Sequence, residues 1–385
     1  PVYYDIYGGD KDKYIARHII MDRLEKTLDG DGISPSSNKY VHLICTAADP
    51  LMLNIARQAA LLCHFPNFDE EKAECRTRIT ILSPDTGSEK ELRKLYDRLS
   101  SESIFGNLLT ECQWSMSVYG KPISFESEKK NTFIDVEIEV VGFEDASTDG
   151  YWSDFHPDKE EITTIIAYPG SISDKNLTTM RRICHQVHIA DGEYREVPMA
   201  VDMRMARRVN IVYRKGTGDR NIFNDNPKDA KAYSKLLRQL VGKIPRKVEI
   251  ESWENSGLPE INQSSNLCCS DCFPYYLRSV MTSDGQEPVK PLIDNIAALS
   301  RAEHARWNVE KLIMGFRSLT PKEILKDELL TGSAKSEYRK RLKSEKIHID
   351  LCPMHRLVCI DPESLKYASF IILAIPAILD SLKGR

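Results

Sequence analysis

The feature that most constrains the fold is a regular alternation of short apolar segments with longer amphipathic segments along the first half of the chain. The short segments are rich in β-branched residues and predict strands at Tyr40–Cys45, Arg78–Leu82, Ile134–Val141 and Ile162–Tyr168. The longer segments predict helices at Pro50–Cys63, Glu89–Leu99 and Asp174–Val187. Because strands that alternate with helices form parallel sheets covered on both faces, we expect an α/β fold with a doubly wound, Rossmann-like parallel sheet.

The rest of the chain lacks this alternation, and we divide it into three further regions. Residues 1–39 form a lead-in with an amphipathic helix over 11–28. The sheet domain spans 40–215, and its last strands are predicted at Val197–Val201 and Asn210–Tyr213. Residues 216–290 hold one candidate helix, Pro227–Val241, and a stretch rich in Gly, Pro, Ser and Asn that predicts an irregular linker. Residues 291–385 predict a small, mostly helical domain.

Composition disfavours some classes of protein. The 385 residues carry a formal net charge of -4, which lacks the basic field that a nucleic-acid binder uses for phosphate contacts. Ten cysteines without the close spacing of a disulfide framework favour a cytoplasmic protein with free thiols. The longest apolar run, Ala368–Leu379, is too short to span a bilayer and predicts a buried strand or core helix. The first residue is Pro1, so the sequence is also compatible with the cytoplasmic part of a protein whose membrane segment lies upstream.

The loop after the first predicted strand is the first candidate ligand site. In a dinucleotide fold this turn carries glycines that let a pyrophosphate approach the backbone, whereas here Ala47 and Ala48 take their place. Thr46 and Asp49 add polar groups beside a helix N-terminus that can bind an anion or a ribose. Asp49 followed by Pro50 is equally a normal helix cap, so both interpretations stand.

Asp85 is a further candidate, because it follows the second predicted strand. An acidic residue at this place can accept a hydrogen bond from a ribose hydroxyl. Its surrounding sequence, Ser-Pro-Asp-Thr-Gly, is also that of an ordinary turn, and we favour the turn.

The alternating region is similar to the TrkA-type NAD-binding domains found in some bacterial proteins. The similarity lies in four runs: His42–Phe65, Arg78–Leu82, Thr163–Tyr168 and Val197–Val201. The resemblance implies a nucleotide-like ligand above the sheet. The absence of the glycine loop argues against NAD as that ligand.

The segment Ser300–Phe316 is the strongest local signal in the C-terminal part. The spaced residues of Glu-His-x-Arg-Trp-x-x-Glu-Lys-x-x-x-Gly-Phe from Glu303, followed by His-x-Asp-Leu-x-Pro from His348, resemble the ryanodine-receptor (RyR) repeat domain. The chain departs from this pattern after Phe316, where a long charged insert replaces a Tyr- or Pro-rich turn. The resemblance implies a small helical module for recognition or assembly.

Four residues of this segment are candidate ligand contacts: His304, Arg306, Trp307 and Lys311. Their charge and aromatic rings suit an anionic or aromatic ligand. The alternative is an internal network, in which the glutamates form salt bridges, the histidine is hydrogen-bonded and Trp307 belongs to the core. For Trp307 we favour the core.

Two pairs of residues have metal-ligand spacing: Cys269 with Cys272, and Cys352 with His355. Together they can form a tetrahedral zinc site. The pairs lie far apart in the sequence and each is a short motif, so we predict no metal. The sequence also lacks a P-loop, a zincin helix and an ordered Ser-His-Asp triad.

These features together predict a sensor. A nucleotide-derived small molecule is expected between the sheet domain and the helical module of a homo-oligomeric, regulatory protein. By fold-level analogy with the bacterial architectures it resembles, the setting is signalling, including antiviral defence or control of ion transport. Two alternatives stay open: an NAD-dependent or nucleotide-hydrolysing enzyme, and a scaffold that only assembles.

Overall fold

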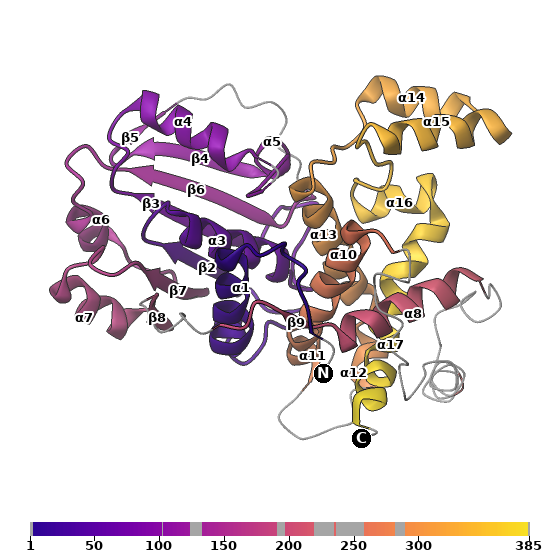
Figure 1. Ribbon diagram of the computed structural model, residues 1–385, viewed down its shortest axis with the longest axis horizontal. Coiled ribbons are helices and arrows are strands. Elements are labelled where there is room, and N and C mark those ends of the chain that lie inside the picture. The colour runs from indigo at the N-terminus through magenta and orange to yellow at the C-terminus, as the bar shows by residue number, and fades with distance from the viewer. Residues whose placement is uncertain are drawn as a thin grey trace.

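The protein combines a seven-stranded sheet with a group of helices at one end (Figure 1). The structure is a computed structural model that describes residues 3–101, 103–123, 133–190, 197–218, 235, 258–281 and 289–383. The strands run in the order β5-β4-β6-β3-β2-β7-β8. Their bounds are β2 Tyr40–Cys45, β3 Thr77–Ser83, β4 Gln113–Val118, β5 Lys121–Pro122, β6 Val136–Gly142, β7 Glu161–Ala167 and β8 Gln186–Ile189. All pairings in this sheet are parallel except β4 with β5, which confirms the expected α/β fold with a mostly parallel sheet.

Successive side chains of a strand point to opposite faces of the sheet, and both faces are buried because helices cover them. On β2, Leu43 belongs to the large core cluster, whereas its neighbour Ile44 packs in a smaller cluster on the opposite face. Helices α3 (Pro50–Leu62) and α4 (Glu89–Leu99) pack on the first face, while α6 (Asp149–Asp154) and α7 (Asp174–Ile183) cover the second. A short helix, α5 (Leu108–Glu111), precedes β4.

The predicted N-terminal helix over residues 11–28 is confirmed as one continuous helical segment. It consists of α1 (Lys11–His18), a π-helical part η1 (Ile19–Leu24) and α2 (Glu25–Leu28). Its apolar face packs on α3. The π-helical part was not predicted, because hydrophobic periodicity does not distinguish it from an α-helix.

Three predictions in the sheet region are wrong. The helix from Asp174 ends at Ile183 and not at Val187, because the next residues pair with β7 as edge strand β8. Of Val197–Val201, only Val201 is in a strand, β9 (Val201–Asp202), which pairs with β1 (Tyr3–Tyr4) outside the main sheet. Asn210–Tyr213 lies inside helix α8 (Arg204–Gly218).

The residues that flank Asn210–Tyr213 explain why this segment forms a helix and not the predicted strand. The local run Asn-Ile-Val-Tyr is rich in β-branched residues, as strands are. The buried positions Ala206, Val209 and Val212 nevertheless recur every three residues, which keeps them within about 120° of one another around a helix axis. That face packs on α10 (Glu260–Asp271) and α17 (Pro362–Lys383).

The expected irregular linker is wrong for residues 260–280. These residues form α10 and α11 (Phe273–Val280), and their buried side chains join the main core. Pro274 stands in the first turn of α11, where its missing N–H removes no intrahelical hydrogen bond. The candidate helix Pro227–Val241 lies outside the described residues, apart from residue 235.

The expected helical character of the C-terminal part is confirmed. Its helices are α12 (Val289–Asp294), α13 (Ile296–Ile313), α14 (Pro321–Leu329), α15 (Gly332–Ser344), α16 (Met354–Ile360) and α17. The apolar run Ala368–Leu379 lies in α17 and is a core helix, one of the two alternatives expected. No helix in the described ranges has the length and apolarity that crossing a membrane requires.

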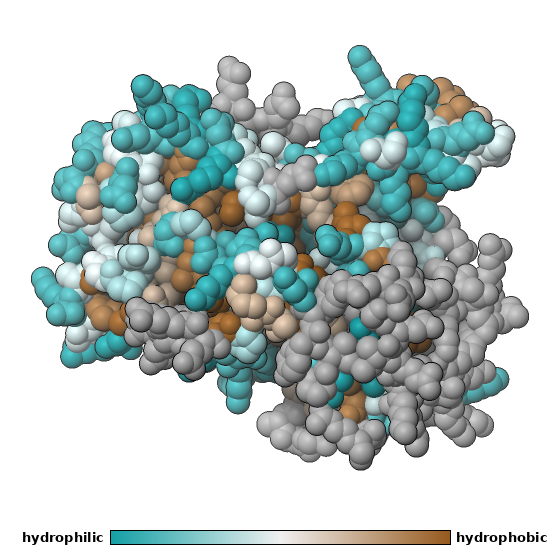
Figure 2. Space-filling model, in the orientation of Figure 1, coloured by the Kyte–Doolittle hydropathy of each residue, from teal (hydrophilic) through white to brown (hydrophobic). Residues whose placement is uncertain are grey.

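Helices α14 and α15 form a hairpin that projects from the body (Figure 1) and has its own small apolar cluster around Tyr338 and Leu342. Figure 2 shows a largely hydrophilic outer surface on this hairpin.

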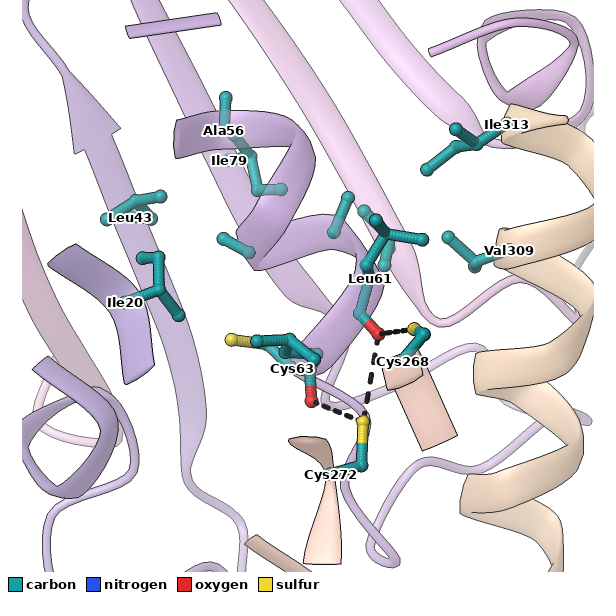
Figure 3. Packing of buried hydrophobic residues seen from close by; sticks show 14 of the residues in the cluster. Ile20, Leu43, Ala56, Leu61, Cys63, Ile79, Cys268, Cys272, Val309 and Ile313 are labelled. Atoms are coloured by element: carbon teal, nitrogen blue, oxygen red, sulfur yellow. Dashed lines mark hydrogen bonds between the residues drawn. The ribbon is translucent and has the colours of Figure 1, made fainter. Parts of the chain in front are cut away.

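The sheet and the C-terminal helices share one hydrophobic core. The Sγ atom of Cys268 on α10 lies 3.3 Å from the backbone oxygen of Leu61 at the end of α3, and Val309 and Ile313 of α13 complete the contact (Figure 3). At its edge, Arg17 makes a bidentate ion pair with Asp271, with N–O distances of 2.7 and 2.8 Å. The helices and the sheet therefore form one packed body.

Candidate ligand-binding sites

A first crevice, of about 660 Å³, lies at the carboxyl ends of β2, β3 and β7. The chain continues from β2 to β3 on one side and reaches β7 on the other, so the strand order reverses here. Ligands of doubly wound sheets bind at such a reversal. Four predicted residues line it: Thr46, Ala47, Asp49 and Asp85.

Thr46 helps to fix the shape of this crevice, which is called the switch-point crevice below, and contributes less to the binding of a ligand. Its hydroxyl accepts a hydrogen bond from the Tyr168 backbone N–H at 2.8 Å and bonds the Ser171 hydroxyl. These bonds join the loops that follow β2 and β7. Thr46 is fully buried, so a ligand would meet the neighbouring alanines first.

Asp49 has the capping role that the sequence offered as an alternative. Its Oδ1 atom accepts hydrogen bonds from the backbone N–H groups of Leu51 at 2.9 Å and Met52 at 3.4 Å. Asp85 is exposed in the turn after β3, and the turn is the interpretation that we favoured from the sequence. Both carboxylates reduce the affinity of the crevice for an anion.

Sequence reasoning missed two cations and an aromatic ring of the crevice. Lys94 and Arg98 reach it from α4, and Arg98 also donates to the backbone oxygen of Ala48. Tyr168, after β7, is 46% exposed, which is high for a ring of its size. The cations stand one helical turn apart at i and i+4, a signal that a helix-face analysis of Glu89–Leu99 could have found.

A second pocket, of about 720 Å³, lies among the C-terminal helices and is called the helical pocket below. Its walls come from α8, α10, α13, α15, α16 and α17 and from the segment between α15 and α16. Three predicted residues line it: His304, Trp307 and Lys311. They come from α13 at positions i, i+3 and i+7, so one face of this helix forms a wall of the pocket.

His304 is a neutral imidazole in this wall. Its Nε2 atom lies 2.8 Å from the Cys352 backbone oxygen, which can only accept a hydrogen bond, so Nε2 carries the proton. Burial lowers the pKa of His304 to about 4. Its ring stacks on Trp307 with a centroid distance of 6.2 Å and an interplanar angle of 9°.

Trp307 is half-buried, between the core and the pocket, rather than purely a core residue. The His348 ring meets it edge-on at 4.9 Å, and the Lys311 ammonium lies 5.7 Å from its centroid. Burial, with help from two lysines, lowers the pKa of His348 to about 3, so this second histidine is also neutral. The result is a continuous aromatic wall.

Arg306 does not line the pocket and belongs to an internal network, the alternative that the sequence left open. The side chain is 1% exposed and donates to both oxygens of Glu303, at 2.8 and 2.9 Å, and to Glu310. Lys311 also donates to Glu310, at 2.9 Å. Burial opposes ionisation of Glu310, but Lys311 and Arg306 more than offset it and hold its pKa at about 2.

The rim of the helical pocket carries cations that sequence reasoning missed. Lys340 and Lys343 are exposed on α15, and neither has a carboxylate partner among the residues described here. Arg339 beside them is held by a bidentate bond to Asp327 at 2.8 Å. Only the tertiary placement of the hairpin brings these side chains to α13, because α14 and its flanking loops separate the two helices in the sequence.

Asp350 also lines the helical pocket and was not among the candidate ligand contacts. It is 9% exposed and accepts a hydrogen bond from the Ser364 hydroxyl at 3.0 Å. Burial, together with Asp361, raises its pKa to about 6. A buried carboxylate with a raised pKa beside a pocket is typical of a functional site.

The candidate zinc ligands do not come together. Cys272 lies against the end of α3 and Cys269 is buried near Glu303, whereas His355 is exposed and lies 3.8 Å from a Glu70 oxygen. Cys352 contributes its backbone oxygen to His304. Over the described ranges, no three His, Cys, Asp or Glu side chains are grouped in a way that could hold a metal ion.

The two sites share no lining residue, so the structure does not bring the loop after β2 together with the α13 residues. The helical pocket is the larger and has more aromatic and cationic side chains. Comparison of the chain with protein-family models, with curated proteins and with solved structures found no match.

Proposed function

We propose that this protein is a sensor of a nucleotide-derived small molecule, which binds in the helical pocket. The observation that carries the proposal is the composition of that pocket, which combines an aromatic wall with a cationic rim in about 720 Å³. Small-molecule sites typically have volumes of about 300–1,000 Å³, mostly apolar walls and a few placed polar groups. A nucleotide has the matching parts, a flat ring and an anionic phosphate.

The surroundings of the pocket support a sensing role. Helix α13 forms one wall, and the chain just after its C-terminus is bonded to the sheet domain: the Asn107 side chain donates to the backbone oxygens of Gly315 at 2.8 Å and Phe316 at 3.1 Å. Helix α10 forms another wall and contacts the end of α3. A ligand that shifts α13 or α10 would therefore change the packing between helices and sheet.

The proposal is tested by thermal shift and calorimetry with AMP, GMP, ADP-ribose, NAD and cyclic dinucleotides. A ligand at about 100 times its Kd stabilises the folded state by about 2.7 kcal/mol, which is easily detected. The double variant Lys340→Glu/Lys343→Glu should weaken binding, because it reverses the charge of the rim. The matched variant Lys94→Glu/Arg98→Glu reverses two cations of the switch-point crevice and should leave binding unchanged.

Each outcome has a meaning for the proposal. Loss of binding only in the crevice variant would move the ligand to the switch point. Absence of any shift across the panel would contradict a nucleotide sensor. Retained cofactor absorbance in the purified protein would support an NAD-dependent enzyme instead.

A further inference from the structure

The helical pocket is lined by two side chains that carry a hydrogen-bond acceptor, and the second of them constrains its ligand further. The first is Nδ1 of His304. Because Nε2 carries the proton and donates to Cys352, Nδ1 presents a lone pair. His304 is 5% exposed and lines the pocket.

The second acceptor is the carboxylate of Asp350. One oxygen accepts a bond from Ser364, while Oδ1 is buried with no hydrogen-bond partner among the described residues. A buried acceptor without a partner destabilises the folded state, and native proteins rarely leave one without reason. A ligand that donates hydrogen bonds would supply the missing partner.

These two acceptors lie on one continuous wall. His304 stacks on Trp307, Trp307 meets the His348 ring at 4.9 Å, and Nδ1 of His348 lies 3.8 Å from the Asp350 carboxylate. A flat ring placed against the Asp350 end of this wall would present its edge to that carboxylate. The cations of α15 line the same pocket and are available to an anionic group.

We propose that the Asp350 carboxylate selects a base whose edge carries adjacent N–H donors, so that the pocket prefers guanine nucleotides; the inference rests on the proposed function. An ionised carboxylate only accepts hydrogen bonds. Guanine offers N1–H and its 2-amino group side by side, whereas adenine presents the lone pair of N1 beside its amino group. Hypoxanthine keeps N1–H but lacks the 2-amino group, so IMP can make only the hydrogen bond from N1–H.

The test is calorimetry of the full chain with GMP, IMP and AMP at about pH 7.5, where Asp350 is ionised. GMP should bind about 10- to 100-fold more tightly than IMP or AMP, because each weaker ligand loses a hydrogen bond to a charged group. Asp350→Asn should reduce this preference to less than about threefold, since an amide also donates. The same variant should raise the Tm of the ligand-free protein, because it removes a buried, underbonded charge.

Asp380→Asn is the matched control, since Asp380 is exposed on the same helix as Ser364, lines neither pocket and undergoes the same chemical change. It should leave the GMP preference intact. A purely structural role for Asp350 would lower the Tm of Asp350→Asn and leave the preference unchanged, and this result would overturn the inference.

If the wild type binds GMP, IMP and AMP equally, and Lys340→Glu/Lys343→Glu weakens this binding, the guanine preference is overturned and the proposed function is kept. If none of the nucleotides in either panel binds, both fail.

Discussion

The Nε2 atom of His304 lies 2.8 Å from the backbone oxygen of Cys352, and this contact joins α13 to the segment before α16. This bond favours the charged ring, but burial outweighs it and lowers the pKa of His304 from 6.5 to about 4. In the unfolded chain the ring takes up a proton near its ordinary pKa, whereas in the folded chain it does so only near 4. This histidine therefore stabilises the fold above about pH 6.5, and its contribution is lost as the pH falls toward 4.

We predict that His304→Gln has a weaker pH dependence of stability than the wild type between about pH 6.5 and 4. This one group can change the free energy of unfolding by at most about 3 kcal/mol over that range, because its pKa falls from 6.5 to about 4 on folding. Urea unfolding at several pH values measures it. His348 acts in the same direction and Asp350 in the opposite one, so the informative quantity is the difference between the two proteins. Parallel curves would contradict the prediction.

The buried network around Arg306 predicts a large effect of a single substitution. Arg306→Met should lower the free energy of unfolding by about 3–5 kcal/mol, because it leaves the carboxylates of Glu303 and Glu310 buried without their main partner. Arg341→Met is a suitable control, since Arg341 is 57% exposed and its pair with Glu345 is at the surface. It should change stability by less than about 1 kcal/mol. Similar small losses in both variants would show that the network does not stabilise the fold.

Most of the sheet domain could be predicted from the sequence because its strands are buried and their apolar runs are short. β2 and α4 have the predicted bounds, Tyr40–Cys45 and Glu89–Leu99. The strands β4, β5 and β8 at the two ends of the sheet were missed, since their side chains are less buried than those of the central strands and their apolar pattern is weaker. In β4 the alternation of Trp114, Met116 and Val118 with polar residues is present and could have been recognised.

The candidate site could be predicted only in part, for a physical reason. His304, Trp307 and Lys311 share one helix, so helical spacing alone places them on neighbouring positions. Arg306 belongs to the same segment but points to the other side, into the core. The walls from α8, α10 and α15 depend on tertiary packing between segments that lie far apart in the sequence, and no local pattern contains that information.

The helix cap at the start of α3 predicts how substitutions of Asp49 change stability. Asp49→Ala should lower the free energy of unfolding by about 0.5–2 kcal/mol, because two backbone N–H groups lose their acceptor. Asp49→Asn should retain most of the stability, since its amide oxygen can cap in the same way. Chemical denaturation of both variants measures the difference. Equal destabilisation by the two substitutions would mean that charge, and not capping, is the contribution of Asp49.

The junction between the sheet and α13 predicts a strong effect at Gly106. This glycine has a φ of +53°, and a Cβ atom there would lie 2.5 Å from the Ile313 backbone oxygen and 2.7 Å from that of Leu312. Gly106→Ala must therefore push the loop away from the end of α13, and we expect a loss of more than about 2 kcal/mol together with weaker ligand binding. Gly120→Ala is matched in conformation, with a φ of +76°, but its Cβ would meet nothing within 4 Å. It should cost only about 1 kcal/mol. Chemical denaturation of the two variants compares these losses, and equal values would show that backbone conformation alone, and not the contact with α13, makes glycine necessary at this junction.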